Sequence, residues 1–443
     1  MNLSSYLTSN RLVYILIGGI AFLVFVTLIV IVSNFGGGGG GQAGADLTFW
    51  GTFDDVAVMD GAIREYQRAN PGVKVLYSVF PYADYERELV NALAAGTGPD
   101  IFMAHHTWLP KHGDKMLAAP ERVAGEDQPF FTVAQFRNTF VDVAEQDLTA
   151  GGLVYAMPLY MDTLALYYNR DVFGSAGVAL PPATWQDFLD VVPKLVIKDE
   201  NFNIVQAAVP LGTARNVNRS TDILMMLMLQ NGVRMVNDQL TQATFSTSVD
   251  GQPVGENALT FYTQFAMPTQ QVYTWNDAQD YSVDAFAAGK AAMMLNYSHQ
   301  IPLIRAKNPR LNFTVAPAPQ HNVADARTYA SYFAVAVSRQ TASPAAAWRF
   351  VRYLTAGDGT VTYLNASLRP SARRDLIDQQ QHDTDLGVFA RQALTARSWF
   401  QVDSTAIETI FADMIENVIL GRQTVRQALQ QAQSAVSVRM SGR

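Results

Sequence analysis

The apolar residues of this chain follow different patterns before and after residue 45. Residues 12–32 are apolar or small, without one charged side chain, which a soluble helix rarely sustains on every face. As a helix this run is about 31 Å long, close to the thickness of about 30 Å of a bilayer's hydrocarbon core. Six glycines, Gly36 to Gly41, follow it. We therefore predict a transmembrane anchor at 12–32 and a flexible linker at 33–45, with a reach of about 20 Å.

A cleaved signal peptide is the alternative interpretation, since Ala43-Gly44-Ala45 resembles a small-residue cleavage site. The apolar core of a signal peptide spans about 7–15 residues, and this run is longer, so we expect the helix to be retained. Arg11 precedes the run, and Lys and Arg are absent after it until Arg64. By the positive-inside rule, residues 1–11 then lie in the cytoplasm and the main domain lies outside the cell membrane.

Beyond residue 45, short apolar runs alternate with amphipathic segments. The pattern predicts strands at 46–50, 73–77 and 100–104, separated by helices at 56–70 and 82–95. This order is typical of a parallel sheet with helices on its faces, whose ligands bind at the carboxyl ends of the strands. Later in the chain we expect strands at 165–168, 291–295 and 332–337. We expect one helix that begins at Thr184, and further helices at 220–230, 283–288, 344–354, 405–420 and 425–438.

Composition limits the kind of protein this is. The chain has 443 residues and is 49% hydrophobic, which suits two domains or one two-lobed unit with a sizeable core. A net charge of −7 argues against nucleic acid as a partner, because binding its phosphates requires a basic surface. The absence of cysteine excludes disulfides, thiolate zinc sites, cysteine nucleophiles and a lipid-modified N-terminal cysteine.

Five segments, taken in order along the chain, carry a resemblance to one family. The first, Gly96-Thr-Gly-Pro-Asp-Ile-Phe102, fits a pattern of Gly-x-x-Pro-Asp followed by two hydrophobic residues. The other four are Met157–Asn169, Pro181–Phe188, Asp284–Met294 and Gly421–Leu429. Together they resemble the extracellular solute-binding proteins of ABC importers, in the sugar-binding group related to maltodextrin-binding protein. The resemblance extends over about residues 46–438.

The resemblance implies an α/β protein with the type II periplasmic-binding-protein fold, in which two lobes joined by two or three crossovers enclose a ligand cleft. Lobe 1 would comprise 46–161 plus 331–367, and lobe 2 would comprise 162–330 plus 368–443. The family implies a mono- or oligosaccharide ligand and an ABC permease that reads the closure of the lobes. We expect a monomer held at the membrane by its N-terminal helix, without a cofactor and without enzymatic activity.

Sugar-binding sites combine planar polar side chains, which fix hydroxyl groups, with aromatic rings, which stack on the C–H face of the sugar. The strand-end loops and the expected crossovers supply both kinds of side chain. The candidate ligand-binding residues are Asp54, Asp55, His105, His106, Trp108, Tyr160, Asp162, Asn216, Asn296, Tyr297, Ser331, Tyr332 and Arg369.

Several candidates have structural alternatives. Asp54 or Asp55 would also serve as the N-cap of the following helix. Asp162 would satisfy backbone donors at a hinge, and Arg369 would form a salt bridge. A metal site at His105, His106 and the nearby His112 is a weaker interpretation, since metal-binding histidines usually have helical spacing or added acids.

Two departures from the family pattern concern the aromatic residues. Tyr297 stands where the family usually has a tryptophan that stacks under a sugar. Glu408, Thr409 and Ala412 stand where maltodextrin-binding protein has stacking aromatics, which puts maltodextrin itself in doubt as the ligand.

Two other functions stay open. A receptor that presents its ligand to a sensor protein would use the same cleft with a different partner. A surface glycosidase would need a pair of carboxylates at a defined separation, and the sequence does not single out such a pair.

Overall fold

The structure is a computed structural model that describes residues 44–123 and 130–441. The predicted anchor at 12–32 and nearly all of the predicted linker lie outside these residues. Within the described part of the chain, no helix is both long enough and apolar enough to cross a membrane. The described residues from Ala45 onward form one compact unit.

The sheet of lobe 1 begins with the parallel strands that the sequence predicts. Its strand order is β2 (Val73–Val79), β1 (Ala45–Gly51), β3 (Ile101–His105), β15 (Phe333–Ser338) and β4 (Met116–Leu117), with β7 (Ala156–Pro158) also paired to β15. Strands β1, β2 and β3 run parallel, and β15 pairs antiparallel with β3. The first residue of β15, Phe333, pairs with the last residue of β3, His105. β15 therefore begins at the edge of the sheet where the parallel strands end.

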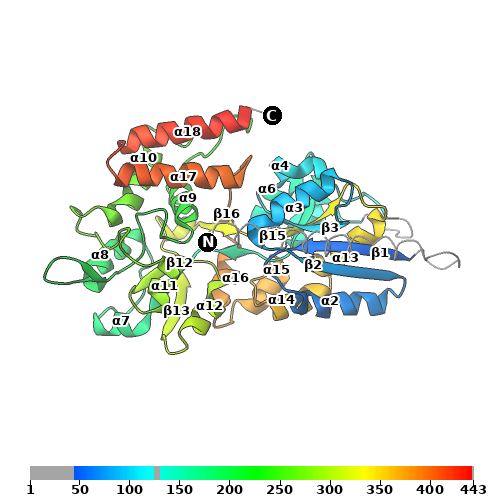
Figure 1. Ribbon diagram of the computed structural model, residues 1–443, viewed down its shortest axis with the longest axis horizontal. Helices are drawn as coiled ribbons and strands as arrows, with labels where there is room; N and C mark the ends of the chain where they lie inside the picture. Colours follow the sequence, from blue (N-terminus) through cyan, green and yellow to red (C-terminus); the bar gives the residue numbers. More distant parts are fainter. Residues whose placement is uncertain (1–43, 124–129, 442–443) are drawn as a thin grey trace, which may run out of the picture. The chain divides into compact units, whose positions relative to one another are not determined.

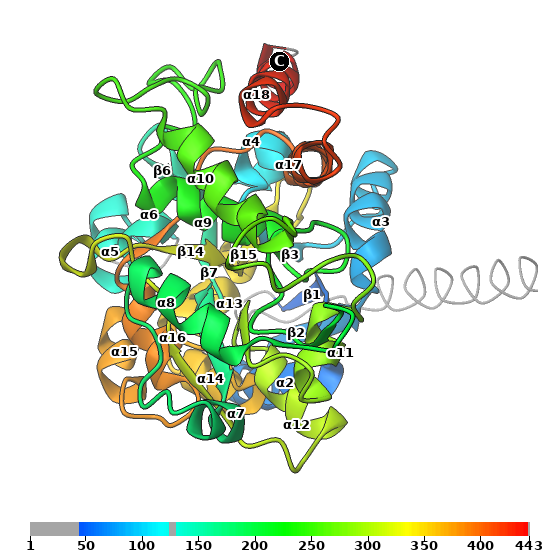
Figure 2. The same ribbon diagram turned by 90° about the vertical axis from the view of Figure 1, so that its left-hand side faces the viewer.

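Helices cover both faces of this sheet (Figures 1 and 2). On one face lie α2 (Val56–Ala69), α13 (Pro344–Ala356) and α14 (Gly359–Ser367), and on the other lie α3 (Tyr82–Ala94) and α6 (Asp142–Leu148). The apolar faces of α2 and α13 bury Met59, Ile63 and Phe350 in the lobe 1 core. Helices α2 and α3 begin and end within one residue of the helices predicted at 56–70 and 82–95.

Lobe 2 has a smaller, antiparallel sheet in the order β12 (Met293–Asn296), β9 (Ala165–Asn169) and β13 (Phe313–Pro317). Around it lie α8 (Trp185–Leu195), α9 (Ser220–Gln230), α10 (Val254–Thr263) and α11 (Ser282–Ala287). Helix α9 is apolar on nearly every face and runs through the core, where it packs on α10. Helices α17 (Ser404–Ile419) and α18 (Val425–Ser441) lie side by side over it (Figure 1).

Within the described residues, three segments pass between the lobes and pair into one small sheet, in the order β16 (Ala396–Arg397), β14 (Thr328–Ser331) and β8 (Asp162–Thr163). Ser331 pairs with Asp162 in the antiparallel register of β14 and β8. Residues far apart in sequence thus meet where the two lobes join.

The core of lobe 1 extends beyond residue 367, where the sequence analysis ends this lobe. Ala372, Leu376 and Ile377 belong to the lobe 1 core, and α15 (Arg374–Gln380) contacts α5 (Val133–Thr139). The third crossing lies at β16, after which Trp399 joins the lobe 2 core. Helix α15 buries a short row of apolar side chains in the core of lobe 1. The sequence shows that this helix has an apolar face, but it does not show which of the two lobes that face packs on.

The remaining elements are short. They are α4 (Leu109–His112), η1 (Gly113–Lys115), β5 (Thr149–Ala150), β6 (Leu153–Val154), α7 (Arg170–Ser175), β10 (Ile197–Lys198), β11 (Ile204–Gln206), η2 (Gln264–Ala266), α12 (Gln300–Lys307), η3 (Val323–Asp325) and α16 (Gly387–Ala393).

Candidate functional site

Between the lobes, the described residues enclose two neighbouring cavities. The first cavity has a volume of about 60 Å³ and is lined by Phe53, Tyr160, Asp162, Arg219, Tyr297, His299, Ser331, Phe333 and Arg369. The second cavity has a volume of about 40 Å³ and is lined by Tyr82, His105, His106, Thr107, Arg219, Asp222, Met225, Tyr329, Ser331, Gln401, Ser404, Thr405 and Glu408. Both lobes contribute walls to each cavity, and Arg219 and Ser331 line both.

A wider groove of about 530 Å³ continues from the second cavity, between α3 and α4 of lobe 1 and the start of α17 in lobe 2. The groove and the second cavity share the residues Tyr82, His105, Ser404, Thr405 and Glu408. The cleft between the lobes is therefore narrow beside the crossovers and widens toward α3 and α17.

Asp162 ties the first crossover to lobe 2. Its Oδ1 accepts hydrogen bonds from the backbone N–H groups of Thr163 (2.9 Å) and Ser298 (3.0 Å), and its Oδ2 accepts one from Ser298 Oγ (2.7 Å). His299 Nδ1 lies 3.7 Å from Oδ2. Asp162 thus does what the hinge interpretation expects, and it also lines the first cavity as the binding interpretation expects.

Tyr160, Arg369 and Asp54 form one cluster at the edge of the first cavity. The Arg369 guanidinium lies 4.7 Å from the centre of the Tyr160 ring, and its Nη2 lies 3.5 Å from Asp54 Oδ1. Asp54 is buried and its Oδ2 accepts a hydrogen bond of 2.7 Å from the Tyr363 hydroxyl. Burial raises the pKa of the Tyr160 hydroxyl above its ordinary value, so this residue stays neutral. Arg369 therefore forms the salt bridge that the sequence left open, and its partner is Asp54. Asp54 itself does not line the cavity, so it acts by fixing the Arg369 side chain.

Asp55 has the structural role that the sequence left open. Its Oδ1 accepts a hydrogen bond of 3.1 Å from Val58 N, which makes it the N-cap of α2. Its side chain is exposed at the start of this helix. The two neighbouring aspartates thus have different roles: Asp55 caps helix α2, and Asp54 pairs with Arg369, which lines the first cavity.

Tyr297 is buried in lobe 2 and is one of the residues that line the first cavity. Its hydroxyl donates a hydrogen bond of 2.8 Å to Asp222 Oδ2. The rings of Tyr297 and His299 stack with an angle of 20° and 6.0 Å between their centres. Burial raises the pKa of Asp222 and lowers that of His299. Asn296 precedes this ring and is fully buried, with its Nδ2 donating to Asn218 Oδ1 at 2.9 Å.

His105 and His106, at the carboxyl end of β3, both line the second cavity. His105 lines the second cavity, and its Nε2 lies 3.3 Å from Ser331 Oγ. Burial lowers the pKa of His105 well below its ordinary value of 6.5, so the ring is neutral near pH 7. His106 also lines this cavity, and its ring stacks on Tyr332 with 4.7 Å between centres. His106 Nδ1 and the Tyr332 hydroxyl both contact Asp147 Oδ2, at 2.9 and 3.0 Å.

Trp108 and Asn216 are further candidates that line neither of the two cavities. Trp108 is buried in the lobe 1 core, where it stacks on Tyr85 with 5.9 Å between ring centres, and it is one of the residues that line the wider groove. Asn216 lies inside lobe 2, where its Oδ1 accepts a hydrogen bond from Trp275 Nε1 (3.0 Å) and its Nδ2 donates to Asn276 O (2.9 Å). Asn216, a candidate ligand-binding residue, therefore lines neither cavity, and its amide group instead fixes the surrounding loop of lobe 2.

His112, the third histidine of the metal-site interpretation, is paired with a carboxylate of lobe 1. Its Nε2 lies 2.8 Å from Glu86 Oε1. Among the residues that the structure describes, no three His, Cys, Asp or Glu side chains are grouped so that they could hold a metal ion.

Two aromatic residues near the strand ends of lobe 1, Phe53 and Tyr82, line the cavities without being among the candidates predicted from the sequence. Phe53 and Tyr82 follow β1 and β2, their rings stack with 4.8 Å between centres, and each residue is 52% exposed. Phe53 lines the first cavity and Tyr82 lines the second. Phe53 also has a left-handed backbone, with φ of 65°, which is uncommon for an aromatic residue and marks a constrained site. The signal available in the sequence was an aromatic residue two or three positions past the end of a strand, since β1 ends at Gly51 and β2 ends at Val79.

Arg219, Glu408 and His299 are further cavity residues that the sequence analysis did not place at the site. Glu408 was considered only for the aromatic ring it replaces. Burial raises the pKa of the Glu408 carboxyl. Arg219 lies three residues after the candidate Asn216 in the sequence.

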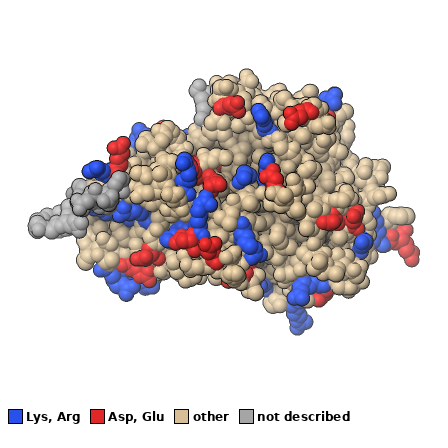
Figure 3. All heavy atoms as spheres, turned by 180° about the vertical axis from the view of Figure 1, so that it is seen from behind, with Lys and Arg blue, Asp and Glu red and all other residues tan. Residues whose placement is uncertain are grey.

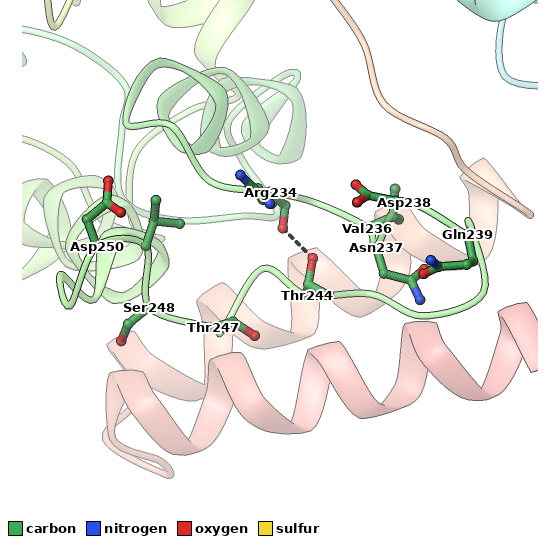
Figure 4. A pocket seen from close by; sticks show the side chains of 10 residues that line it. Arg234, Val236, Asn237, Asp238, Gln239, Thr244, Thr247, Ser248 and Asp250 are labelled. Carbon is green, nitrogen blue, oxygen red and sulfur yellow. Dashed lines mark hydrogen bonds between the residues drawn. The ribbon is translucent and has the colours of Figure 1, made fainter.

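A larger hollow of about 440 Å³ lies away from these cavities, on the surface of lobe 2. Figure 4 shows its side chains spread along the loop from Arg234 to Asp250, without converging on a common point. The face in Figure 3 carries basic and acidic side chains interspersed, without a broad basic surface. We therefore place the functional site at the interlobe cavities.

Comparison with known proteins identifies the family. Residues 50–360 match the family described as bacterial extracellular solute-binding protein. The chain belongs to this family. A binding protein of Brucella abortus (strain 2308) is 22% identical to this solute-binding protein over 366 residues, covering 79% of this chain and 83% of the relative. The maltotriose-binding protein of Pyrococcus abyssi is 23% identical over 320 residues, covering 71% of this chain and 63% of the relative.

Among solved structures, the sugar-binding protein MalE of Xanthomonas citri superposes on this solute-binding protein with a TM-score of 0.73. The two chains are 19% identical, and the match covers 90% of this chain and 98% of the other. The α/β periplasmic-binding-protein fold that the sequence predicts is thus confirmed.

Proposed function

We propose that this chain is a membrane-tethered substrate-binding protein, which captures a carbohydrate in the cleft between its lobes and delivers it to the permease of an ABC importer. The observation that carries the proposal is the composition of the two cavities, whose walls combine carboxylate, guanidinium, imidazole and hydroxyl groups with aromatic rings. Planar polar groups beside aromatic rings are the combination that suits a sugar. The relatives described as maltotriose-binding and sugar-binding support a ligand of this class.

Binding and closure are linked because both lobes contribute to each cavity. In the first cavity, Arg369 and His299 donate hydrogen bonds to hydroxyl oxygens, and the rings of Phe53 and Tyr297 flank the sugar. A ligand held by both lobes stabilises the closed arrangement over the open one. The small sheet of β8, β14 and β16 joins the lobes and acts as the hinge. The permease then recognises the closed, loaded form.

The N-terminal segment supplies the tether in this proposal. The apolar run at 12–32 anchors the chain in the cell membrane with residues 1–11 in the cytoplasm, and the glycine-rich linker gives the binding unit a reach of about 20 Å. Fractionation of cells, followed by intact-mass measurement of the membrane-bound chain, tests this part. Recovery of the full-length mass from membranes supports the tether. A cleaved chain in the soluble fraction would refute it.

A thermal-shift screen tests the ligand class. We expect at least one sugar from a panel of mono-, di- and trisaccharides to raise the melting temperature of the protein, because a ligand that binds only the folded form stabilises it. Peptides and polyamines are the comparison sets. If these raise the melting temperature and no sugar does, the proposed ligand class is wrong.

A further inference from the structure

Arg219 occupies a special position at the start of α9. Its backbone is left-handed, with φ of 63° and ψ of 27°, which a non-glycine residue seldom adopts. Neighbouring hydrogen bonds fix this loop, from Asn218 N to Ser282 Oγ (2.8 Å) and from Ser220 Oγ to Ala214 O (2.9 Å). The constrained backbone directs the Arg219 side chain into the cleft, where it lines both cavities.

The Arg219 side chain has hydrogen-bonding capacity left over. Its guanidinium lies 5.7 Å from the centre of the Tyr297 ring. Its Nε is buried and has no hydrogen-bond partner among the residues that the structure describes. A buried donor without an acceptor costs free energy, so an acceptor supplied by a ligand is strongly favoured there. Arg369, the other arginine of the cavities, differs because Asp54 already pairs with it.

The charges around Arg219 indicate what kind of acceptor fits. Asp222, Glu408 and Tyr82 line the second cavity together with Arg219, and Tyr297 lines the first cavity with it. The negative charges of the two carboxyl groups favour the charged guanidinium. Asp222 Oδ2 already accepts the Tyr297 hydroxyl. Two carboxyl groups beside one guanidinium leave no excess of positive charge, and they would repel a phosphate or a sugar acid. An uncharged oxygen, such as a hydroxyl or a glycosidic oxygen, is therefore the favoured partner.

The aromatic pair of lobe 1 extends across the same junction. Phe53 lines the first cavity and Tyr82 lines the second, and the two rings stack on each other. The junction between the cavities thus has arginine on the lobe 2 side, and each cavity has an exposed aromatic residue of lobe 1. Each cavity provides polar groups and a ring for one sugar unit.

We propose that Arg219 binds an uncharged oxygen at the junction of two sugar units, and that the ligand is a neutral oligosaccharide of at least two rings. One ring occupies the first cavity beside Tyr297, and the next occupies the second cavity beside Tyr82. This inference rests on the proposed function, because it names the ligand of the same cleft.

Isothermal titration of the full-length protein in detergent tests the inference. The probes are gluco-, manno-, galacto- and xylo-configured mono-, di- and trisaccharides, together with glucose 6-phosphate and galacturonic acid. We expect the best disaccharide to bind at least tenfold more tightly than its own monosaccharide unit. The two anionic sugars should bind more weakly than the best neutral disaccharide. Equal affinity for monosaccharide and disaccharide, or tighter binding of an anionic sugar, would overturn the inference while leaving sugar capture intact.

Variants at Arg219 then test the residue itself. Arg219→Met should weaken disaccharide binding at least tenfold, and Arg219→Lys should recover part of this loss because it keeps the charge without the planar fork. Arg215→Met is the matched control, since Arg215 lies in the same loop, is largely exposed and pairs with Asp413 at 4.0 Å. The control should bind as the natural chain does. If Arg219→Met fails to fold, the disaccharide affinity of Arg219→Lys alone tests the role of this residue. Unchanged affinity in the folded Arg219 variants overturns the inference, and absence of binding by every sugar overturns the proposed function as well.

Discussion

Lys111 and Asp403 form an ion pair across the cleft, with Lys111 Nζ 3.1 Å from Asp403 Oδ2. Lys111 lies on α4 of lobe 1, where its Nζ also contacts Glu86 Oε1 at 2.7 Å. Asp403 is the N-cap of α17 in lobe 2, and its Oδ1 accepts the hydrogen bond from Ala406 N. One carboxylate thus caps a helix with one oxygen and holds the opposite lobe with the other. The pair therefore links the two lobes directly.

Lys111→Met should shift the ligand-free protein toward the open arrangement. Partly exposed ion pairs contribute up to about 1 kcal/mol, so ligand affinity should fall about two- to fivefold. Small-angle scattering of the ligand-free protein measures the opening as an increase in radius of gyration. Lys307→Met is the control, because Lys307 pairs with Asp284 at 2.7 Å within lobe 2. An equal increase in the control, or no increase in Lys111→Met, would contradict this role.

Glu86 should make stability depend on pH in the acidic range. The hydrogen bond from His112, with further help from Lys111, lowers the pKa of Glu86 from 4.5 to about 2. A carboxyl group with a lowered pKa stabilises the folded state above its unfolded pKa, and this contribution disappears as the pH falls through the folded pKa. Urea unfolding should therefore show Glu86→Gln less stable than the natural chain at pH 7. This difference should shrink between about pH 4.5 and about pH 2, and a constant difference would refute the assignment.

Asp162→Ala should lower both stability and affinity. The substitution leaves Ser298 N and Ser298 Oγ without their acceptor in a buried site, which costs about 2–4 kcal/mol. Asp162→Asn keeps one acceptor oxygen, and it should lose less stability. Urea unfolding and titration with the best sugar measure the two effects. If Asp162→Ala were as stable as the natural chain, the hinge contact would not matter for folding.

Exposed aromatic residues at the cleft should matter for binding and little for folding. Phe53→Ala should weaken sugar binding by about 1–2 kcal/mol, because stacking against the C–H face of the sugar is lost. Phe53→Gly should bind as weakly, yet it should be at least as stable as Phe53→Ala, since glycine adopts a φ of 65° without strain. Titration and thermal unfolding of the two variants check both parts. Full affinity in Phe53→Ala would remove this ring from the site.

The sequence was most informative for elements whose periodicity is local. Helix α9 begins and ends where the apolar run from Ser220 to Gln230 predicts, and β8 begins at Asp162, the residue at which the expected lobe 2 begins. Side-chain partners were harder, because they depend on contacts distant in sequence. Asn216 has a polar loop signature, yet it is used by Trp275, whereas Arg219, three residues later, reaches the cleft because of a left-handed backbone that sequence alone does not reveal.

A crystal structure of the protein with the sugar that most raises its melting temperature tests the central claim most directly. We expect the sugar between the lobes, in contact with Arg219 and Phe53 and within hydrogen-bond distance of Arg369. A sugar bound elsewhere, or bound to one lobe without contact to the other, would contradict capture in the interlobe cleft.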